Sequence, residues 1–266
     1  MKKLAIIILN KSNNHLLFKC INSILCKTKY LYYNIYIGDT GSSKEELDEI
    51  ISFLRNNFSK TKNVKLINYN YYNFSKTNNN LVLKHLNNED VYLFCNNDIE
   101  LIDDCITPVM DMFNKDENES IGTVGVKLLF ADETIQHAGQ LLFLNSDGTF
   151  KHITHRGLRE SKEKYSSQEN VIGNTGGFMF TSRKSFESIG GFNENYIECL
   201  EDVEYNLEVL LLGKQNIYRG DLSSFHFESQ TRNKNPKQLE NFILDANSRL
   251  IPFVNKNVKK INYEIL

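Results

Sequence analysis

Cysteine is scarce in this chain, and the cysteines present form no recognisable set. The five are scattered, and no two of them make a Cys-x-x-Cys pair. The sequence therefore indicates neither a disulfide framework nor a zinc site. Most of them lie in apolar runs, where a thiol is most simply a small buried side chain.

An excess of basic charge and a long apolar run are also missing. The formal net charge of −2 argues against nucleic acid as a partner, since proteins that bind it carry a basic surface. No segment approaches the roughly 18 apolar residues that a membrane span needs. The opening, Met1–Lys3 followed by apolar Leu4–Leu9, is similar to a secretion signal, but the apolar run is short and no small-residue cleavage site follows it. We expect a buried first strand and a soluble, cytoplasmic protein.

Two phosphate-binding signatures are absent as well. No Gly-x-Gly-x-x-Gly follows the first predicted strand, and no Gly-Lys-Ser/Thr loop occurs in the chain. Both motifs bring backbone N–H groups close to a phosphate at the start of a helix. Dinucleotide-binding and P-loop functions are therefore disfavoured.

Strand and helix patterns alternate through the first hundred residues. Short apolar runs predict strands at Leu4–Leu9, Tyr33–Ile37, Val64–Ile67 and Val91–Phe94. Between them apolar residues recur at helical spacing, and Ser43 with Glu46 forms a capping box at the start of the second helix. Such alternation gives right-handed βαβ units and a mostly parallel sheet. The fold class is therefore α/β.

The rest of the chain mixes both kinds of element. Predicted elements are a helix at Thr107–Phe113, a strand at Thr123–Phe130, a hairpin around Asp147-Gly148, strands at Val171–Asn174 and Phe178–Thr181, a helix from Asp202 to Gly213, strands at Asn216–Tyr218 and Ser223–His226, and a helix after Pro236. The polar stretch from Lys151 to Asn170 is predicted to be a mobile loop. No Pro/Gly/Ser-rich linker or internal repeat divides the chain, so we expect one domain over residues 1–266.

A buried strand that ends in polar residues is the most informative local pattern. Apolar Val91–Cys95 is followed at once by Asn96–Asp98. In open α/β sheets, ligands bind beyond the carboxyl ends of the strands, so Asp98 is a candidate oxygen ligand. Mg²⁺ or Mn²⁺ that bridges to a substrate phosphate takes one or two such protein ligands. The alternative is a plain polar turn, because Asn and Asp favour turns.

Six short motifs follow one another along the chain. They are Asp39–Ser42, Asn73–Asn79, Asn96–Asp98, Lys127–Phe130 with Thr134–Gly139, Glu201-Asp202 before a helix, and His226–Ser229. In this order they resemble the motifs of GT-A-type glycosyltransferases of family 2, in particular a rhamnosyltransferase-like subgroup. The resemblance runs from Leu4 to about Arg232. It implies a GT-A fold with a nucleotide-sugar-binding half at residues 1–100, an acceptor and catalytic half at 101–232, and a C-terminal helix at 233–266.

The resemblance also implies residues that bind the donor. Asp39 would accept a hydrogen bond from the nucleotide base, and the helix start that carries Asn79 would face the nucleotide. Ser229 and Arg232 are candidates for the diphosphate, since a guanidinium suits bidentate phosphate binding. The plainer alternatives are a turn-forming Asp39 and a solvated charge at Arg232.

The metal-binding motif departs from the family pattern. Asn96, Asn97 and Asp98 stand where the family carries Asp-x-Asp, so an amide replaces the first acid. The resemblance implies that Asn96 and Asn97 contact the nucleotide-sugar donor. The resemblance implies that Asp98 and His226 hold Mn²⁺ or Mg²⁺, and imidazole is an accepted ligand of Mn²⁺. The alternative for His226 is a buried, hydrogen-bonded histidine at the end of a strand. The loop Leu9–Ser12 also lacks the family's Pro-x-Tyr-Asn.

The Glu201-Asp202 motif supplies the catalytic candidates. A carboxylate within reach of an acceptor hydroxyl can remove its proton as the oxygen attacks, and the resemblance gives this role to Asp202. One base opposite the leaving group implies single displacement with inversion. Glu201 would orient the acceptor. The alternative is that Asp202 only caps the helix that it precedes.

We therefore expect a metal-dependent, inverting glycosyltransferase. It would move a sugar from a UDP- or dTDP-linked donor to a glycan or lipid-linked acceptor in surface polysaccharide biosynthesis, in the cytoplasm or at the inner membrane surface. One rival is a catalytically impaired nucleotide-sugar-binding protein, which Asn96 suggests. A sugar nucleotidyltransferase is disfavoured, because no Gly-rich basic loop follows the first strand. The roles of His137, His152 and His155 stay open.

Overall fold

Four parallel strands and three helices build the amino-terminal half. The elements are β1 (Leu4–Asn10), α1 (Asn14–Lys27), β2 (Tyr33–Asp39), α2 (Lys44–Phe58), β3 (Val64–Asn68), α3 (Phe74–His85) and β4 (Val91–Asn96). The computed structural model describes residues 1–58, 63–86, 88–197, 199–227 and 236–261. β1 pairs in parallel with both β2 and β4, and β2 pairs in parallel with β3. The predicted βαβ alternation is therefore confirmed.

The second half extends the same sheet with mixed strand directions. Its elements are β5 (Ile99–Leu101), α4 (Ile106–Lys115), β6 (Ile121–Leu129), β7 (Ile135–His137), β8 (Gln140–Leu144), β9 (Phe150–His155), β10 (Gln168–Val171), β11 (Phe178–Ser182), α5 (Arg183–Ile189), α6 (Glu201–Leu211), β12 (Gln215–His226), α7 (Pro236–Asn257) and the short 3₁₀ helix Val258–Lys260. In the described part of the chain the sheet has ten strands, in the order β10-β12-β6-β11-β4-β1-β2-β3, with β5 on β12 and β7 on β6. β8 and β9 form a separate ribbon.

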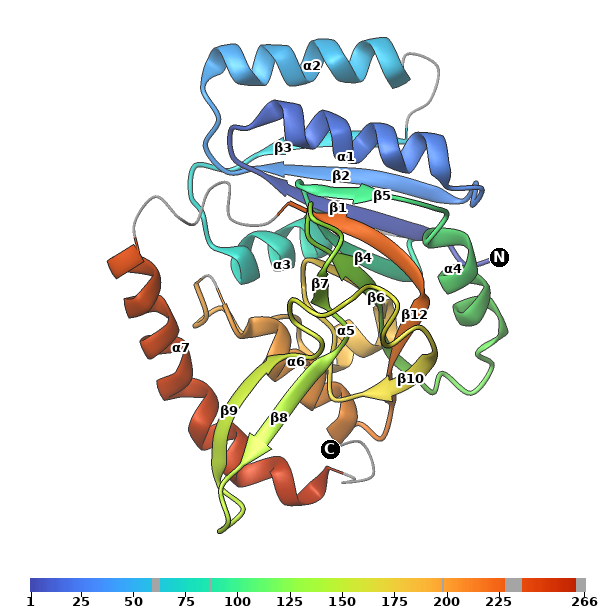
Figure 1. The fold of residues 1–266 in the computed structure, drawn as a ribbon. Helices are drawn as coiled ribbons and strands as arrows, with labels where there is room; N and C mark the ends of the chain where they lie inside the picture. The colour runs from blue at the N-terminus through green and yellow to red at the C-terminus, as the bar shows by residue number, and fades with distance from the viewer. Residues whose placement is uncertain (59–62, 87, 198, 228–235, 262–266) are drawn as a thin grey trace.

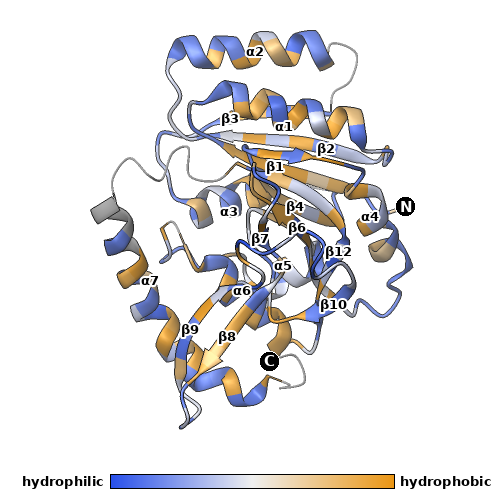
Figure 2. Ribbon diagram, viewed as in Figure 1, coloured by the Kyte–Doolittle hydropathy of each residue, from blue (hydrophilic) through white to orange (hydrophobic). Residues whose placement is uncertain are grey.

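Helices cover both faces of the sheet. Figure 1 shows α1 and α2 on one face and α3 on the other, with α7 beside the β8–β9 ribbon. Alternate residues of β1 enter different cores, because side chains of a strand point alternately to its two faces. Leu4, Ile6 and Ile8 pack under α1, and Ala5 and Ile7 pack on the side of α3. Figure 2 accordingly shows largely hydrophobic central strands and helices of mixed hydropathy.

The capping box of α2 is confirmed, but three predictions about the second half are wrong. The backbone N–H of Ser43 donates to Glu46 Oε2 over 2.7 Å, and that of Glu46 donates to Ser43 Oγ over 3.2 Å. The predicted loop 151–170 contains most of β9 and the start of β10. Among the described strands, β9 pairs only with β8. It carries exposed polar side chains, which made this stretch of sequence resemble a loop. β10 ends at Val171, where the sequence predicted the start of a strand.

The third correction concerns the last strand. The two short strands predicted at 216–218 and 223–226 form one strand, β12, with a register shift between Arg219 and Ser223 in its pairing with β6. β12 runs parallel to β6 and pairs antiparallel with β5, with His226 opposite Ile99. The end of β12 thus lies beside the segment that follows β4, which determines the position of the candidate site.

Candidate active site

Polar side chains gather where β1, β2 and β4 end. The sheet register sets Asn10 opposite Asp39 and Leu9 opposite Asn96. Asn10 Nδ2 donates to Asp39 Oδ2 over 3.0 Å, and Asn97 Nδ2 donates to Asn10 Oδ1 over 2.9 Å. Carboxyl ends of parallel strands are where α/β sheets bind ligands, so this edge is the candidate site.

Asp39 is buried and its carboxylate is fully engaged. Oδ1 accepts the backbone N–H groups of Gly41 and Ser42 over 3.2 and 2.9 Å. Oδ2 accepts the Ser42 hydroxyl over 2.5 Å as well as the Asn10 amide. A carboxylate has about four acceptor sites, and these bonds use them. Asp39 therefore fixes the turn after β2, and a bond to a nucleotide base would require one of these donors to move.

Asp98 and His226 meet at the same edge. Asp98 Oδ1 lies 3.2 Å from His226 Nε2, and both side chains are largely buried. The other ring nitrogen, Nδ1, lies 2.6 Å from Gln136 Oε1. Because an amide oxygen only accepts hydrogen bonds, Nδ1 carries the proton and donates it. In the neutral ring Nε2 then presents its lone pair toward the carboxylate oxygen.

This arrangement fits a divalent cation. Asp98 Oδ1 is buried and accepts no hydrogen bond from the described residues, which is costly for a carboxylate unless a cation or proton satisfies it. Two ligands of one octahedral ion, each about 2.1 Å from it, lie about 3 Å apart. No group of three or more His, Cys, Asp or Glu side chains in the described ranges is placed so that it could hold a metal ion. A pair of protein ligands suffices for Mg²⁺ or Mn²⁺ when phosphate and water complete the coordination.

Asn96 contacts the same imidazole. Its Nδ2 lies 3.2 Å from His226 Nε2, so the amide donates to the lone pair that faces Asp98. Its backbone N–H donates to the Gly177 carbonyl over 2.8 Å. A Cβ on Gly177 would lie 3.2 Å from His226 Cε1 and 3.4 Å from Asn96 Nδ2. Glycine at 177 therefore lets the backbone approach both side chains.

The segment Thr175–Gly177 connects this group to Asp202. The backbone N–H of Gly176 donates to Asp202 Oδ2 over 2.8 Å. Among the described residues, no hydrogen-bond donor reaches the second carboxylate oxygen, Oδ1. The carboxylate is half-buried and is thus held by one oxygen while the other can accept a proton.

Asp202 does not cap its helix, so that alternative is wrong. α6 begins at Glu201, and Leu200 stands at the N-cap position with φ 67° and no side-chain cap. Asp202 and the buried Glu201 lie in the first turn, where negative charge is favourable beside the positive end of the helix dipole. The carboxylate of Asp202 points instead to Gly176.

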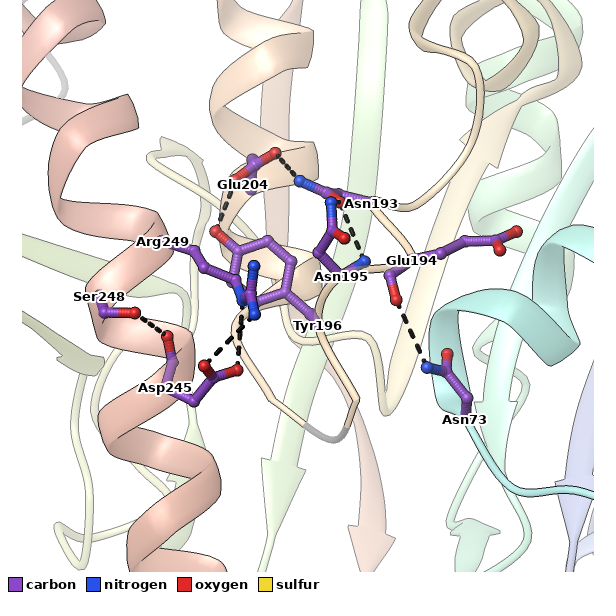
Figure 3. Close-up of polar contacts among 9 residues, drawn as sticks. All are labelled: Asn73, Asn193, Glu194, Asn195, Tyr196, Glu204, Asp245, Ser248 and Arg249. Atoms are coloured by element: carbon purple, nitrogen blue, oxygen red, sulfur yellow. Dashed lines mark hydrogen bonds and ion pairs between the residues drawn. The ribbon is translucent and has the colours of Figure 1, made fainter.

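The loop that leads into α6 is anchored from several sides (Figure 3). Glu204 accepts hydrogen bonds from the Tyr196 hydroxyl over 2.5 Å and from Asn193 Nδ2 over 2.8 Å. Burial, with that bond to Glu204, raises the pKa of Tyr196 well above its ordinary value. On the other side, Asn73 Nδ2 donates to the Glu194 carbonyl over 3.4 Å. The chain just before Asp202 is therefore tied to both α3 and α6.

Asn79 belongs to this anchoring and not to the strand-end group. Its Nδ2 donates to the Phe192 carbonyl over 2.8 Å, and its Oδ1 accepts the Phe192 N–H over 2.9 Å. The amide is buried and its atoms are engaged with the loop backbone. The nucleotide contact of Asn79 stays a prediction, as does the phosphate role of Ser229 and Arg232, which lie outside the described residues.

Two of the three histidines without a sequence-based role lie near the site. His137 Nε2 accepts the Thr175 N–H over 3.3 Å, and its Nδ1 lies 2.9 Å from Nδ1 of His155. Burial, with further contributions from His155, His226 and Arg156, lowers the pKa of His137 well below its ordinary range. The neutral ring therefore supports the backbone next to Gly176. His152 stacks on Phe143 in the β8–β9 ribbon.

Gln136 and Asn10 belong to the site but were not among the predicted site residues. Gln136 lies in one of the motifs, yet only the pairing of both β7 and β12 with β6 brings it to His226. Asn10 could have been found, because it is a polar residue at the end of an apolar strand.

The order and direction of the strands and the helices that cover them are those of the GT-A fold. One solved structure with this fold is that of GalNAc-T7 with UDP, GalNAc and Mn²⁺, with a TM-score of 0.69 at 15% identity over 89% of this chain and 45% of that one. Another is the mannosyltransferase PcManGT from Pyrobaculum calidifontis in complex with GDP-Man and Mn²⁺, with a TM-score of 0.65 at 11% identity over 94% of this chain and 64% of that one. The predicted GT-A fold is confirmed.

The chain belongs to glycosyl transferase family 2, whose model matches residues 4–190. It is 26% identical over 232 residues to the O-antigen biosynthesis protein RfbC of Myxococcus xanthus, and 24% identical over 233 residues to the uncharacterized protein y4gI of Sinorhizobium fredii. Each match covers 86% of this chain but only 18% and 25% of the relative. The chain thus spans a quarter or less of these curated relatives. Within the described residues, no helix has the length and apolar character of a membrane span.

Proposed function

We propose that this family 2 glycosyltransferase transfers a sugar, with inversion and with a divalent metal, from a UDP- or dTDP-linked donor to a hydroxyl of a glycan or lipid-linked acceptor. The observation that carries the proposal is the shared segment Thr175–Gly177. Gly176 holds Asp202 over 2.8 Å, and the carbonyl of the next residue, Gly177, holds Asn96 beside the Asp98–His226 pair. The proposed base and Asn96, two residues before the proposed metal ligand Asp98, are therefore hydrogen-bonded to adjacent residues of one backbone segment.

On the donor side, Asp98 and His226 are the residues that would hold Mn²⁺ or Mg²⁺. A bound divalent ion supplies Lewis-acid stabilisation of charge on the leaving diphosphate. Asn97 and Asn10 keep the loop after β4 attached to β1 over 2.9 Å. Asn96 offers an amide to the donor sugar or ribose, and Asp39 shapes the turn beside it.

On the acceptor side, Asp202 is the general base. The acceptor oxygen bonds to the anomeric carbon as the bond from that carbon to the diphosphate oxygen breaks. The proton of the hydroxyl passes to Asp202, and the electron pair leaves with the nucleoside diphosphate. Gly176 donates to one oxygen of the carboxylate, which leaves the other to take the proton. Glu201, next to it in the first turn of α6, would orient the acceptor.

The comparisons support the kind of substrate. The solved structures with the same fold contain UDP or GDP-Man together with Mn²⁺. The similarity to an O-antigen biosynthesis protein supports a role in surface polysaccharide assembly. The proposal also places the enzyme in the cytoplasm or at the inner membrane surface, where a lipid-linked acceptor would be reached. The division into donor half 1–100, acceptor half 101–232 and C-terminal helix 233–266 is part of this proposal.

The test combines binding with turnover. UDP and dTDP are titrated calorimetrically with and without MnCl₂, and a panel of UDP- and dTDP-sugars is screened for nucleotide release with and without candidate glycans. The proposal expects metal-dependent binding of one nucleotide and turnover of a matching donor. Nucleotide binding that Mn²⁺ does not change would refute the metal role.

A second candidate is a nucleotide-sugar-binding protein without transferase activity. The observation that favours it is Asn96, an amide at the position of an acid, within 3.2 Å of His226 Nε2. Tight, Mn²⁺-dependent nucleotide binding with no turnover of any donor in the panel would establish this candidate instead.

A further inference from the structure

Gln136 contacts His226 directly and from a rigid position. It lies at the centre of β7, whose neighbouring residues pair with Leu128 and Leu129 of β6. The glutamine is 3% exposed and the histidine 6%. Its Oε1 lies 2.6 Å from His226 Nδ1, a short distance for a hydrogen bond between a ring nitrogen and an oxygen. The strand thus holds one acceptor in a fixed place behind the ring.

That acceptor determines which ring nitrogen carries the proton. A neutral histidine can be protonated at either nitrogen, and the partner of one nitrogen decides the state of the other. With Nδ1–H donated to Gln136, the lone pair is on Nε2, 3.2 Å from Asp98 Oδ1. With the proton on Nε2 instead, the ring would donate to Asp98 and offer no lone pair there.

Asn96 gives independent support for the same protonation state. Its Nδ2, which can only donate, lies 3.2 Å from His226 Nε2. A proton on Nε2 would set two donors against each other. Both amide contacts of the imidazole are therefore satisfied at once only when Nδ1 is protonated and Nε2 is not.

We propose that Gln136 is a positioning residue that fixes the orientation of His226 and selects the tautomer of its neutral ring with the proton on Nδ1, so that the lone pair of Nε2 faces the proposed metal position. The inference rests on the metal role in the proposed function. Hydrogen-bond partners of metal-binding histidines typically change metal affinity 10- to 100-fold when they are removed. Gln136 contacts Nδ1 of the ring, whereas Asp98 lies beside Nε2, so Gln136 would affect the metal through the ring.

The test compares Gln136→Leu, which removes the acceptor, with Gln136→Glu, which retains one. In the metal-free protein, ¹⁵N NMR of the imidazole nitrogens reports which nitrogen of His226 is protonated, and His226→Gln identifies its signals. We expect Nδ1–H in the wild type and in Gln136→Glu, and loss of this preference in Gln136→Leu. We also expect roughly 10- to 100-fold weaker Mn²⁺ binding in Gln136→Leu, measured with MnCl₂ and UDP by electron paramagnetic resonance, and recovery in Gln136→Glu.

Gln140→Leu is the matched control. Gln140 is a buried glutamine at the start of β8, and its Oε1 accepts no hydrogen bond from the described part of the chain. The control should keep the His226 signals and the Mn²⁺ affinity of the wild type. Circular dichroism and thermal unfolding verify that each variant is folded.

The outcomes separate the inference from the proposed function. An unchanged ring state or unchanged Mn²⁺ affinity in folded Gln136→Leu overturns the inference. A wild-type protein that has Nδ1–H at His226 but binds no Mn²⁺ with UDP overturns the metal role, and with it the purpose assigned to Gln136.

Discussion

Replacing Asp202 by Asn should remove the proposed base and leave its surroundings intact. In the wild type, Asp202 Oδ2 accepts the Gly176 N–H over 2.8 Å. The carbonyl oxygen of an asparagine can accept the same bond, so Thr175–Gly177 keeps its anchor. The amide cannot take a proton from an acceptor hydroxyl at neutral pH. Asp202→Asn therefore changes the chemistry of this position much more than its geometry.

The expected loss of transfer rate follows from the loss of the base with its surroundings retained. A positioned general base typically contributes 10²- to 10⁴-fold to the rate, which corresponds to about 3–5 kcal/mol of activation free energy. Since the bond to Gly176 is retained, the free energy of unfolding should change by no more than about 1 kcal/mol. The affinity for nucleotide should change little, because Asp202 lies on the acceptor side in the proposal.

The assay is nucleotide release from the matching donor, in the presence and absence of acceptor, together with calorimetric titration of the nucleotide with Mn²⁺. Glu208→Gln is the matched control, an acid-to-amide change on the same helix. Burial, and then the neighbouring Glu204, raises the pKa of Glu208 to about 7, and the side chain has no place in the candidate site. The control should retain transfer. Transfer within a few-fold of the wild type in folded Asp202→Asn would refute the assignment of the base.

Three further predictions concern the metal site and the fold. Asp98→Ala should lower Mn²⁺-dependent nucleotide affinity at least tenfold in calorimetry; equal affinity with and without Mn²⁺ in both proteins would contradict it. Asn96→Asp should strengthen Mn²⁺ binding roughly tenfold, since an added unit charge near the ion contributes about 1 kcal/mol or more; weaker binding would show that the amide is needed. Burial would raise the pKa of Glu89, but hydrogen bonds from Tyr36 and Asn34, each 2.7 Å long, outweigh it and hold the pKa at about 2 against an ordinary 4.5. Because the folded pKa is depressed, this stability is present above pH 4.5 and is lost as the pH falls toward 2. Glu89→Gln should therefore lower the free energy of unfolding by up to about 3 kcal/mol at pH 7. Urea unfolding should show a smaller difference in this free energy between variant and wild type at pH 3.

The amino-terminal half could be predicted because local patterns determine it. Each of its strands is a short apolar run, and the capping residues Ser43 and Glu46 are three positions apart. β12 was predicted less well, since the polar stretch from Arg219 to Ser223 interrupts its apolar pattern. That stretch is a register shift within one strand, and only the neighbouring strand β6 makes the two pieces continuous.

The parts of the site that join distant segments needed the structure. His226 and Gln136 are 90 positions apart. They meet because β12 and β7 both pair with β6. The motif order gave Asp98 and His226 as partners and Asp202 as the base of the same reaction, but it did not give the contacts that link them. The link is the backbone of Thr175–Gly177, which contributes two N–H groups and a carbonyl. Backbone groups hardly depend on the type of residue, so these contacts could not be predicted from the sequence.

Asn96 illustrates what an amide can do where the family has an acid. An acid at position 96 would put a second carboxylate near Asp98, and the two negative charges would repel each other without a metal. The amide is neutral, and its N–H group donates to His226 Nε2, so the ring is held in place without a metal. At the proposed metal site the same bond occupies the lone pair that a metal would need, so the bond would have to break on binding. The expected consequence is a site that is well ordered without metal and binds it more weakly than a site with two acids.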